Sequence, residues 1–486
     1  MSQAVDDTLV MSLAALHMHR RTGQVIGILH LPDDVLKIIV ELCAGCEPAV
    51  IGRYEGWIRL TWVCRRLRYV VISMPRLFAE NYTEYPGAQG VFRIRAGDQP
   101  LCYHVSASRP RMSKPIVHSG KEIRRMTHIR QSADFAACSQ IWIIRRGDVV
   151  EHLKRLMLFP SLTKLEEIRA SIEYEQQNAY AFVRDVNSPS FTGRLWAPHL
   201  LRAYFESCWL PIVAAGLRLL HITWDPDVNT PCPSAMAIHR ALISRHASTL
   251  EDLQIRDALA SPSADLSVAQ TLAAPSFPRV QLPHLHNLVL VGCPLSYVRM
   301  LGALVIPSTA AVQLGLDCEE FPQLRDTLPM VVKVLVDRLP VPTTTINAVR
   351  VVVRQTQDGL LDVLVSGAVV PRDAIRLGDW HRPKTPRPAL DICLLGVDTQ
   401  EVEWADEIVP ILRKMNAGIS IDGIAFDLPD WCFTEDEVDW VRLFECVPAA
   451  RTVRPLERII DTIEDSENPD VVSLRGRLAG YSDTSR

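Results

Sequence analysis

Cysteine and histidine pairs are the first residues whose spacing could support chemistry. Cys43 and Cys46 form a single C-x-x-C pair, whereas a structural zinc site needs four ligands and therefore a second pair at suitable spacing. His284 and His286 form an H-x-H pair, but no carboxylate or further histidine flanks them at close range. We interpret both pairs as structural or surface residues, and we expect no metal and no cofactor.

Known catalytic patterns are absent from the sequence. It contains no phosphate-binding G-x-x-x-x-G-K-[ST] or G-x-G-x-x-G motif, and no H-E-x-x-H or G-x-S-x-G motif. Asp225 and Asp227 could hold a cation, but an aspartate-rich turn around Pro226 explains them equally well. Catalytic triads can be dispersed along a sequence, so the absence of motifs does not exclude a hydrolase. No set of residues supports one, however. We therefore predict no catalytic residues and a protein that is not an enzyme.

The composition is that of a globular protein with more than one folded unit. The chain has 486 residues, of which 48% are hydrophobic and 22% charged, with a net charge of -4. This charge gives no reason to expect binding to nucleic acid or membranes. Twelve scattered cysteines favour reduced thiols and a cytoplasmic or nuclear location. No run approaches the roughly 18 apolar residues of a membrane span.

Two amphipathic helices and a short third one are expected between Leu31 and Phe78. Leu31 and Pro32 open the first helix, and Asp33 and Asp34 complement the positive end of its dipole. The expected apolar stripes are Leu31, Val35, Ile39 and Cys43 in the first helix, and Trp57, Leu60, Cys64, Leu67 and Val71 in the second. Two helices this short cannot bury both stripes, so we expect another polypeptide to cover part of them.

Three segments in this order resemble the F-box-like domains abundant in mushroom-forming fungi. They are Leu31-Pro32 with the apolar helix that follows, residues 57–66 (WIRLTWVCRR) and residues 73–78 (SMPRLF). Leu67 and Phe78 stand where the family has tryptophan, and Asp34 replaces its glutamate. These changes keep size class or charge, so the resemblance implies a small three-helix F-box over residues 30–80.

The resemblance also implies a function. F-box proteins are substrate receptors of Skp-cullin-F-box ubiquitin ligases, so the chain would bind a Skp-type adaptor and, through it, a cullin. Carried over position by position, the residues expected at the adaptor interface are Leu31, Pro32, Ile38, Ile39, Val63 and Cys64. The alternative is an interaction scaffold outside any ligase, with a drifted F-box, and Leu67 and Phe78 favour it.

A repeat template recurs between residues 200 and 295. Residues 285–295 (LHNLVLVGCPL) fit the leucine-rich-repeat pattern L-x-x-L-x-L-x-x-N/C-x-L at every fixed position. Looser copies begin at Leu200, Leu217 and Leu250, so the copies are spaced by 17, 33 and 35 residues. These irregular spacings predict either a degenerate solenoid or an α/β layer that mimics one.

Strands and helices alternate through the remainder. We expect strands at residues 311–316, 346–353, 360–365, 390–395 and 419–426, and helices at 321–339, 401–415 and 434–446. This rhythm predicts a parallel sheet with right-handed crossovers. The predicted fold class is therefore α+β to α/β: a three-helix F-box followed by an irregular leucine-rich-repeat-like α/β solenoid.

Five segments follow from these patterns. We predict a leading helix and linker (1–29), the F-box-like domain (30–80), an irregular connecting region with a basic cluster (81–140), the repeat array (141–455) and an acidic flexible tail (456–486). An unknown target protein would bind on the concave, strand-bearing face of the array. The candidate contacts, chosen by strand alternation, are Arg202, Tyr204, Glu206, His221, Thr223, Asn287 and Val289.

Overall fold

The computed structural model divides the chain into two compact units. Unit 1 comprises residues 1–170 and 196–200, and unit 2 comprises residues 171–195 and 201–486. The structure describes residues 30–46, 56–83, 88–106, 135–144, 149–172, 177–188, 191–225, 231–259, 277–317, 334, 348–355, 361–368, 390–397, 404–416, 421–427, 437–448, 450, 452–454, 459 and 469–478. The predicted leading helix (1–29) and the whole basic cluster at 109–130 lie outside the described residues, and so does the helix predicted at 321–339, apart from residue 334.

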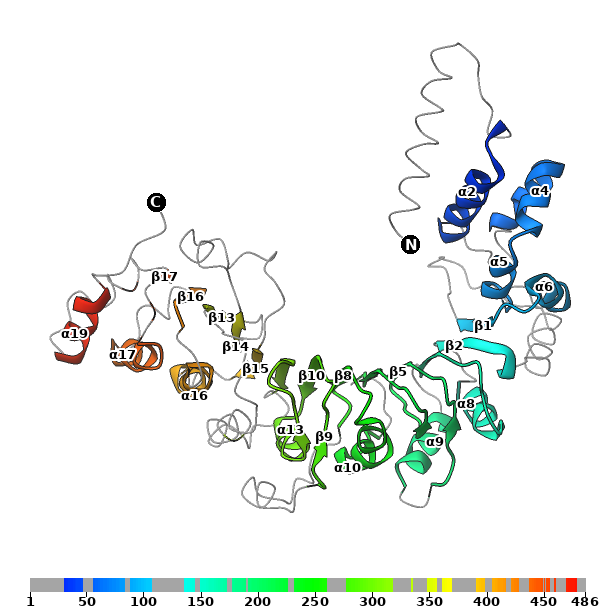
Figure 1. The fold of residues 1–486 in the computed structure, drawn as a ribbon. Coiled ribbons are helices and arrows are strands. Elements are labelled where there is room, and N and C mark those ends of the chain that lie inside the picture. Colours follow the sequence, from blue (N-terminus) through cyan, green and yellow to red (C-terminus); the bar gives the residue numbers. More distant parts are fainter. Residues whose placement is uncertain are drawn as a thin grey trace, which may run out of the picture. The chain divides into compact units, whose positions relative to one another are not determined.

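Unit 1 begins with short helices (Figure 1). They are α2 (Asp33–Cys46), the 3₁₀ turn η2 (Gly56–Arg59), α3 (Leu60–Val63), α4 (Arg65–Ile72), α5 (Pro75–Glu80) and α6 (Gln89–Ala96). The backbone N–H of Leu36 donates to the carbonyl of Pro32 at 3.0 Å, so the first helix starts directly after the proline. The Leu31-Pro32 segment therefore leads into α2, as the sequence predicts.

The second predicted helix is not continuous, and in this respect the prediction was wrong. Cys64 is extended, with φ -158° and ψ 168°, and it separates α3 from α4. Its sulfur accepts a hydrogen bond from the backbone N–H of Leu67 at 3.4 Å, which gives α4 an N-terminal cap. A helix-spaced stripe alone does not reveal such a break.

The core of this helical part is aromatic. The Phe78 ring packs edge-on against Trp57 at 5.5 Å and against Phe92 of α6 at 5.3 Å between centroids. In α2 the fully buried residues are Leu36 and Val40. The stripe predicted for α2 was wrong as the buried face, because Leu31, Val35, Ile39 and Cys43 are only half-buried.

Residues 81–140 were predicted to be irregular, and the described part of this region differs. It contains α6, strand β1 (Leu101–Ser106) and the 3₁₀ turn η4 (Phe135–Ala137), which leads into β2 (Cys138–Ile144). Phe92 of α6 packs against Phe78 and extends the aromatic core. Strand β1 pairs in parallel with β2. Helix α8 (Val149–Leu158) and β3 (Glu167–Ser171) follow, and the three strands are ordered β1-β2-β3.

Unit 2 is built on a sheet ordered β5-β7-β8-β10-β12-β15-β14-β13-β16-β17. The strands are β5 (Arg202–Glu206), β7 (Leu219–Thr223), β8 (Asp252–Arg256), β10 (Asn287–Gly292), β12 (Ala311–Asp317), β13 (Ala348–Gln355), β14 (Leu361–Ala368), β15 (Leu390–Val397), β16 (Gly423–Asp427) and β17 (Thr452–Arg454). Short strands β4 (Leu195–Trp196), β6 (Ile212–Val213), β9 (Val280–Gln281) and β11 (Leu304–Val305) lie outside this order. The mixed α/β class and the parallel sheet are thus as predicted, except that β14 runs antiparallel to both neighbours.

Helices connect the strands of unit 2. They are α9 (Gln177–Asn187), α10 (Ala235–Ile238), the π-helical turn η5 (His239–Ile243), α11 (Ser244–His246), α13 (Pro294–Leu301), α16 (Trp404–Asn416), α17 (Glu437–Glu445) and α19 (Pro469–Leu478). The prediction of an entirely flexible tail was wrong, because α19 buries Leu474 and Leu478. Among the described helices of both units, none is long and apolar enough to cross a membrane.

The four segments matched to the repeat template form four adjacent strands in equivalent register. Ala203, Leu220, Leu253 and Leu288 form one buried row, and Phe205, Ile222, Ile255 and Leu290 form the next. The carbonyls of Leu201, Arg218 and Glu251 each accept hydrogen bonds from two consecutive N–H groups of the next copy. The same bonds recur although the copies are 17, 33 and 35 residues apart, so the irregularity lies in the connections.

The two faces of these four strands differ. Burial alternates along β5, β7 and β8, with every second residue inside. Figure 1 shows α9, α10 and α13 on one side of the strands. Because helices cover this side, we infer that the buried rows face it. The other side carries the residues predicted to contact a target.

Candidate partner-binding surfaces

The six residues predicted to contact an adaptor are all accessible in unit 1. Pro32 and Val63 are exposed, and the side chain of Val63 is 64% exposed. The other four, Leu31, Ile38, Ile39 and Cys64, are half-buried. We call these six residues the helical surface. No described part of the chain fully buries any of them, so their apolar area is available to a second polypeptide.

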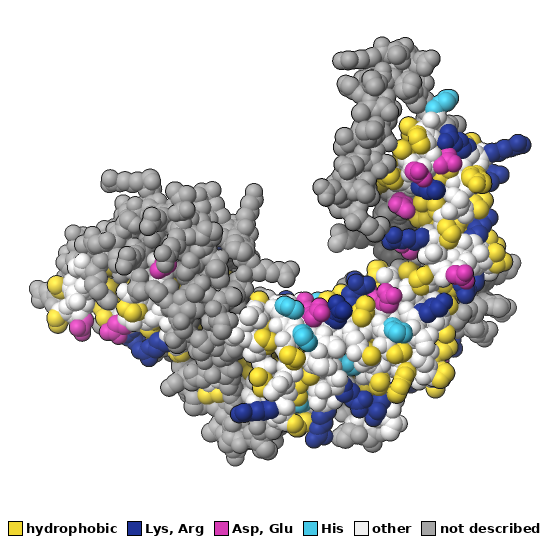
Figure 2. All heavy atoms as spheres, viewed as in Figure 1, with side chains coloured by type: hydrophobic (Ala, Val, Ile, Leu, Met, Phe, Trp, Pro, Cys, Tyr) yellow, Lys and Arg dark blue, Asp and Glu magenta, His cyan; other side chains and the backbone are white. Residues whose placement is uncertain are grey.

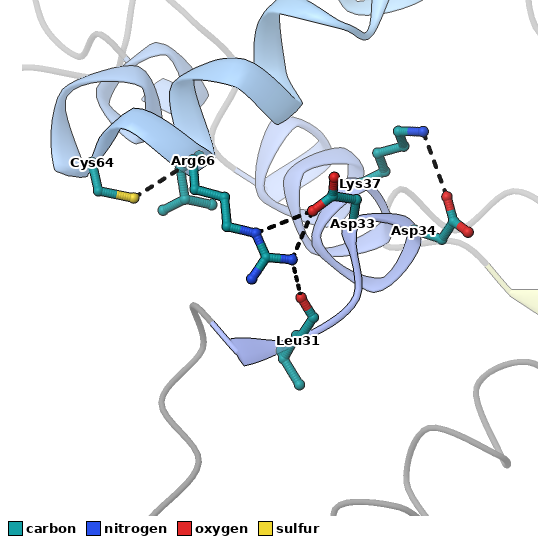
Figure 3. Close-up of polar contacts among 7 residues, drawn as sticks. Leu31, Asp33, Asp34, Lys37, Cys64 and Arg66 are labelled. Carbon is teal, nitrogen blue, oxygen red and sulfur yellow. Dashed lines mark hydrogen bonds and ion pairs between the residues drawn. The ribbon is translucent and has the colours of Figure 1, made fainter.

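Arg66 joins the two ends of the helical surface (Figure 3). Its Nη2 donates to the carbonyl oxygen of Leu31 at 2.6 Å and to Oδ1 of Asp33 at 2.7 Å, and its Nε donates to the same Oδ1 at 3.1 Å. Arg66 lies in the first turn of α4, shortly after Val63 and Cys64. The arginine therefore fixes the start of α2 beside the break between α3 and α4.

Three large exposed side chains of the same helices were missed. Trp62 is 60% exposed, Leu42 is 63% exposed and Tyr69 is 69% exposed. All three lie off the predicted stripes, and a tryptophan or leucine outside a stripe was the signal that could have found them. Trp62 directly precedes Val63, so α3 exposes two adjacent apolar side chains.

The two departures from the F-box pattern lie in the interior. Leu67 is 4% exposed and Phe78 is 1% exposed, and Phe78 contacts Trp57 and Phe92 edge-on. Neither side chain belongs to the helical surface. Their effect is on the packing of the helices, not on the atoms that a partner would meet.

A second surface lies on unit 2, which we call the strand face. It consists of the outward residues of four strands, and neighbouring strands place them in three rows by register. The rows are Arg202, Leu219, Asp252 and Asn287; Tyr204, His221, Gln254 and Val289; and Glu206, Thr223, Arg256 and Val291. All seven residues predicted to contact a target are in these rows. Figure 2 shows charged and histidine side chains along this part of the chain.

One predicted contact is not available. Val289 is only 4% exposed, although alternation places it on the strand face. The register sets it between Gln254 and Gln313, and their longer side chains flank the valine. Of the other six, Arg202 is exposed, and Tyr204, Glu206, His221, Thr223 and Asn287 are half-buried.

Asp252, which the sequence reasoning missed, connects several of the predicted residues. Its Oδ1 receives hydrogen bonds from Nδ2 of Asn287 at 3.1 Å and Nε2 of Gln254 at 3.3 Å, and it lies 3.2 Å from Nε2 of His221. The His221 ring in turn packs edge-on against Tyr204 at 5.1 Å. A D-x-Q-x-R pattern on a repeat strand was the signal, because it puts polar groups at three successive outward positions.

These neighbours control the ionisation of Asp252. Partial burial acts to raise the pKa of the carboxyl group, but the hydrogen bond and charge of His221, with the amides of Asn287 and Gln254, outweigh it and lower the pKa below its usual 3.8. Asp252 is therefore a carboxylate at neutral pH. Its side chain is 27% exposed, so the negative charge reaches the surface.

The histidine pair, the cysteine pair and Cys208 differ in their exposure. His284 and His286 are exposed and precede β10, Cys43 is half-buried, and Cys46 is exposed at the end of α2. Among the described residues no group of three or more metal-binding side chains is found. Cys208 occupies the ladder position of the repeat template and is fully buried; burial raises its pKa well above the usual value, so it remains a thiol.

Comparison with known proteins finds no matching family model, no matching curated protein and no matching solved structure. The class of the protein therefore comes from its own fold. The described chain is a mixed α/β protein with a helical N-terminal part and a mainly parallel sheet.

Proposed function

We propose that the chain is the substrate-receptor subunit of a Skp-cullin-F-box type ubiquitin ligase. The helical surface would bind a Skp-type adaptor and, through it, a cullin. The strand face, in a leucine-rich-repeat-like array, would bind the target protein. This role belongs to the cytoplasm or nucleus and assigns no catalytic residue or cofactor to the chain.

The accessibility of the helical surface is the observation that carries the proposal. All six positions matched to the adaptor interface remain at least partly accessible after the helices have packed. Val63 and its neighbour Trp62 are 64% and 60% exposed, so two adjacent apolar side chains of α3 can be buried by a partner. Burying one such side chain in an interface contributes about 1.5 to 3 kcal/mol by transfer from water.

The position of Leu67 and Phe78 weighs against the alternative of a drifted F-box scaffold. These residues were the reason to doubt adaptor binding, and both are buried inside the helical unit. A substitution in the core that keeps an apolar side chain alters stability more than it alters the surface. The residues offered to the adaptor are therefore the ones that match the family pattern.

Size-exclusion chromatography of the full chain with a purified Skp-type adaptor tests the proposal. We expect the wild-type chain to co-elute with the adaptor and Val63→Asp to elute separately. Ile94→Asp is the matched control, because Ile94 lies on α6 and is 82% exposed. Absence of co-elution with the wild-type chain would reject the ligase role and leave the scaffold alternative.

A further inference from the structure

Strand β8 presents opposite charges at the two ends of the strand face. Asp252, Gln254 and Arg256 are its three outward residues, since side chains alternate along a strand. The two charges lie four positions apart, which is about 13 Å at roughly 3.3 Å per residue. Each charge lies among strand neighbours from β7 and β10 in the same register row.

At the negative end, the described residues hold the Asp252 carboxylate through only one of its two oxygens. All three groups that contact the Asp252 carboxylate, from His221, Gln254 and Asn287, meet its Oδ1. Among the described residues, nothing donates a hydrogen bond to Oδ2. The carboxylate is therefore held in one orientation with one oxygen available, and the Tyr204 ring lies beyond His221 in the same row as that imidazole.

The positive end has no counter-charge among the described residues. Arg256 is half-buried, and within the described chain its guanidinium makes no hydrogen bond, ion pair or ring contact. Its neighbours in register are Thr223 and Val291, which carry no charge. The nearest carboxylate in this row, on Glu206, lies two strands away at roughly 9.6 Å and accepts the hydroxyl of Ser171 at 2.5 Å.

We propose that the strand face binds an extended segment of the target protein that places a basic side chain over Asp252 and an acidic side chain over Arg256. The inference rests on the proposed function, because the bound segment belongs to the target. An extended segment points residues i and i+4 to the same side, and their spacing equals that of Asp252 and Arg256. The two opposite charges also set the direction in which the segment lies.

An array of immobilised random nine-residue peptides, probed with the full chain, tests this recognition. We expect the wild-type chain to select peptides with a basic and an acidic residue four positions apart, in one order only. The double variant D252K/R256E should select the reverse order. Selection without this charge pair, or the same order with both proteins, would overturn the proposal.

A single variant covers the case in which D252K/R256E does not fold. Arg256→Glu removes no hydrogen bond, ion pair or ring contact of the guanidinium within the described chain, so it should keep the wild-type circular dichroism spectrum. It should lose the acidic preference, with binding to the best wild-type peptide weakened about tenfold. The control is Arg245→Glu, an exposed arginine of α11 away from the strand face. Unchanged peptide selection by Arg256→Glu, or equal loss in Arg245→Glu, would overturn the proposal.

Two further measurements distinguish failure of this inference from failure of the proposed function. Co-elution with the adaptor, measured on the same protein, depends on the helical surface alone. If co-elution occurs but no charge-paired peptides are selected, the segment inference fails and the receptor role stands. If the chain is a dimer that Arg256→Glu makes monomeric, a second copy occupies the strand face and the inference is overturned.

Discussion

The guanidinium of Arg66 lies 2.6 Å from the carbonyl oxygen of Leu31, although 35 positions separate the two residues. The same guanidinium also holds the Asp33 carboxylate with two hydrogen bonds. Leu31 and Pro32 precede α2, and the carbonyl of Pro32 accepts the first helical hydrogen bond, from the N–H of Leu36. The hydrogen bond from Arg66 fixes the carbonyl of Leu31, one residue earlier. Arg66 is thus a positioning residue for the segment that the proposed adaptor would meet.

Replacing Arg66 by alanine should therefore affect both folding and binding. We expect unfolding to become easier by about 1 kcal/mol, a small figure because the ion pair is partly exposed. Adaptor binding should weaken further, since the Leu31-Pro32 segment is no longer fixed. Arg66→Lys should lie between, because an ammonium cannot match the forked geometry. Denaturant unfolding and adaptor titration measure the two effects.

Arg65→Ala is the matched control for this prediction. Arg65 is exposed, is adjacent in sequence and makes no side-chain hydrogen bond or ion pair within the described chain. It should change neither quantity. Equal effects of Arg65→Ala and Arg66→Ala would show that total positive charge matters and that the contact with Leu31 does not.

Phe78 should be the residue whose truncation most damages the helical unit. Its ring lies between Trp57 and Phe92 and is 1% exposed. Phe78→Ala removes both edge-on contacts and leaves a cavity, so we expect a loss of about 3 to 5 kcal/mol in the free energy of unfolding. Ile94→Ala, at an 82% exposed position, should cost little. Comparable losses in the two variants, measured by denaturant unfolding, would contradict this packing.

The sequence predicted the strands and helices whose position depends on burying one apolar face. The repeat template located β5, β7, β8 and β10, because alternate apolar residues can be buried only in one register. It did not reveal the break at Cys64, which depends on a local sulfur hydrogen bond, or α6, which forms around Phe92 through contacts distant in sequence. The same limit hid Asp252: its partners His221 and Asn287 lie 31 and 35 positions away.

The depressed pKa of Asp252 makes part of the stability of unit 2 dependent on pH. Since its folded pKa lies below 3.8, the carboxylate stabilises the fold above that pH, and the contribution is lost as pH falls through the lower folded value. The difference in unfolding free energy between wild type and Asp252→Asn should therefore be larger at pH 6 than at pH 3. Urea unfolding at both values measures it.

The contribution of His221 provides the check on this interpretation. Burial opposes the shift in the pKa of Asp252, and the hydrogen bond and charge of His221 are the largest of the effects that lower it. The Asp252→Asn substitution is therefore repeated in a His221→Gln background. We expect its effect on the unfolding free energy to depend less on pH there. An unchanged pH dependence would assign the stabilisation to Asn287 and Gln254 alone.

Gly292 should tolerate no side chain, because both its conformation and its surroundings exclude one. Its φ of 127° is one that L-residues rarely adopt, and a Cβ would lie 3.0 Å from Oδ1 and 3.2 Å from Cα of Asp257. The backbone there cannot easily move, since the N–H of Asp257 and the hydroxyl of Tyr297 both donate to the carbonyl of Val291. We expect Gly292→Ala to lower the free energy of unfolding by about 2 to 3 kcal/mol.

Gly216→Ala is the control. Its new methyl group meets only Leu201 Cδ2 at 3.6 Å, so the free energy of unfolding should change by no more than about 1 kcal/mol. Thermal or urea unfolding measures the stability of the two variants. Equal stability would contradict the prediction and mean that the turn after β10 can rearrange.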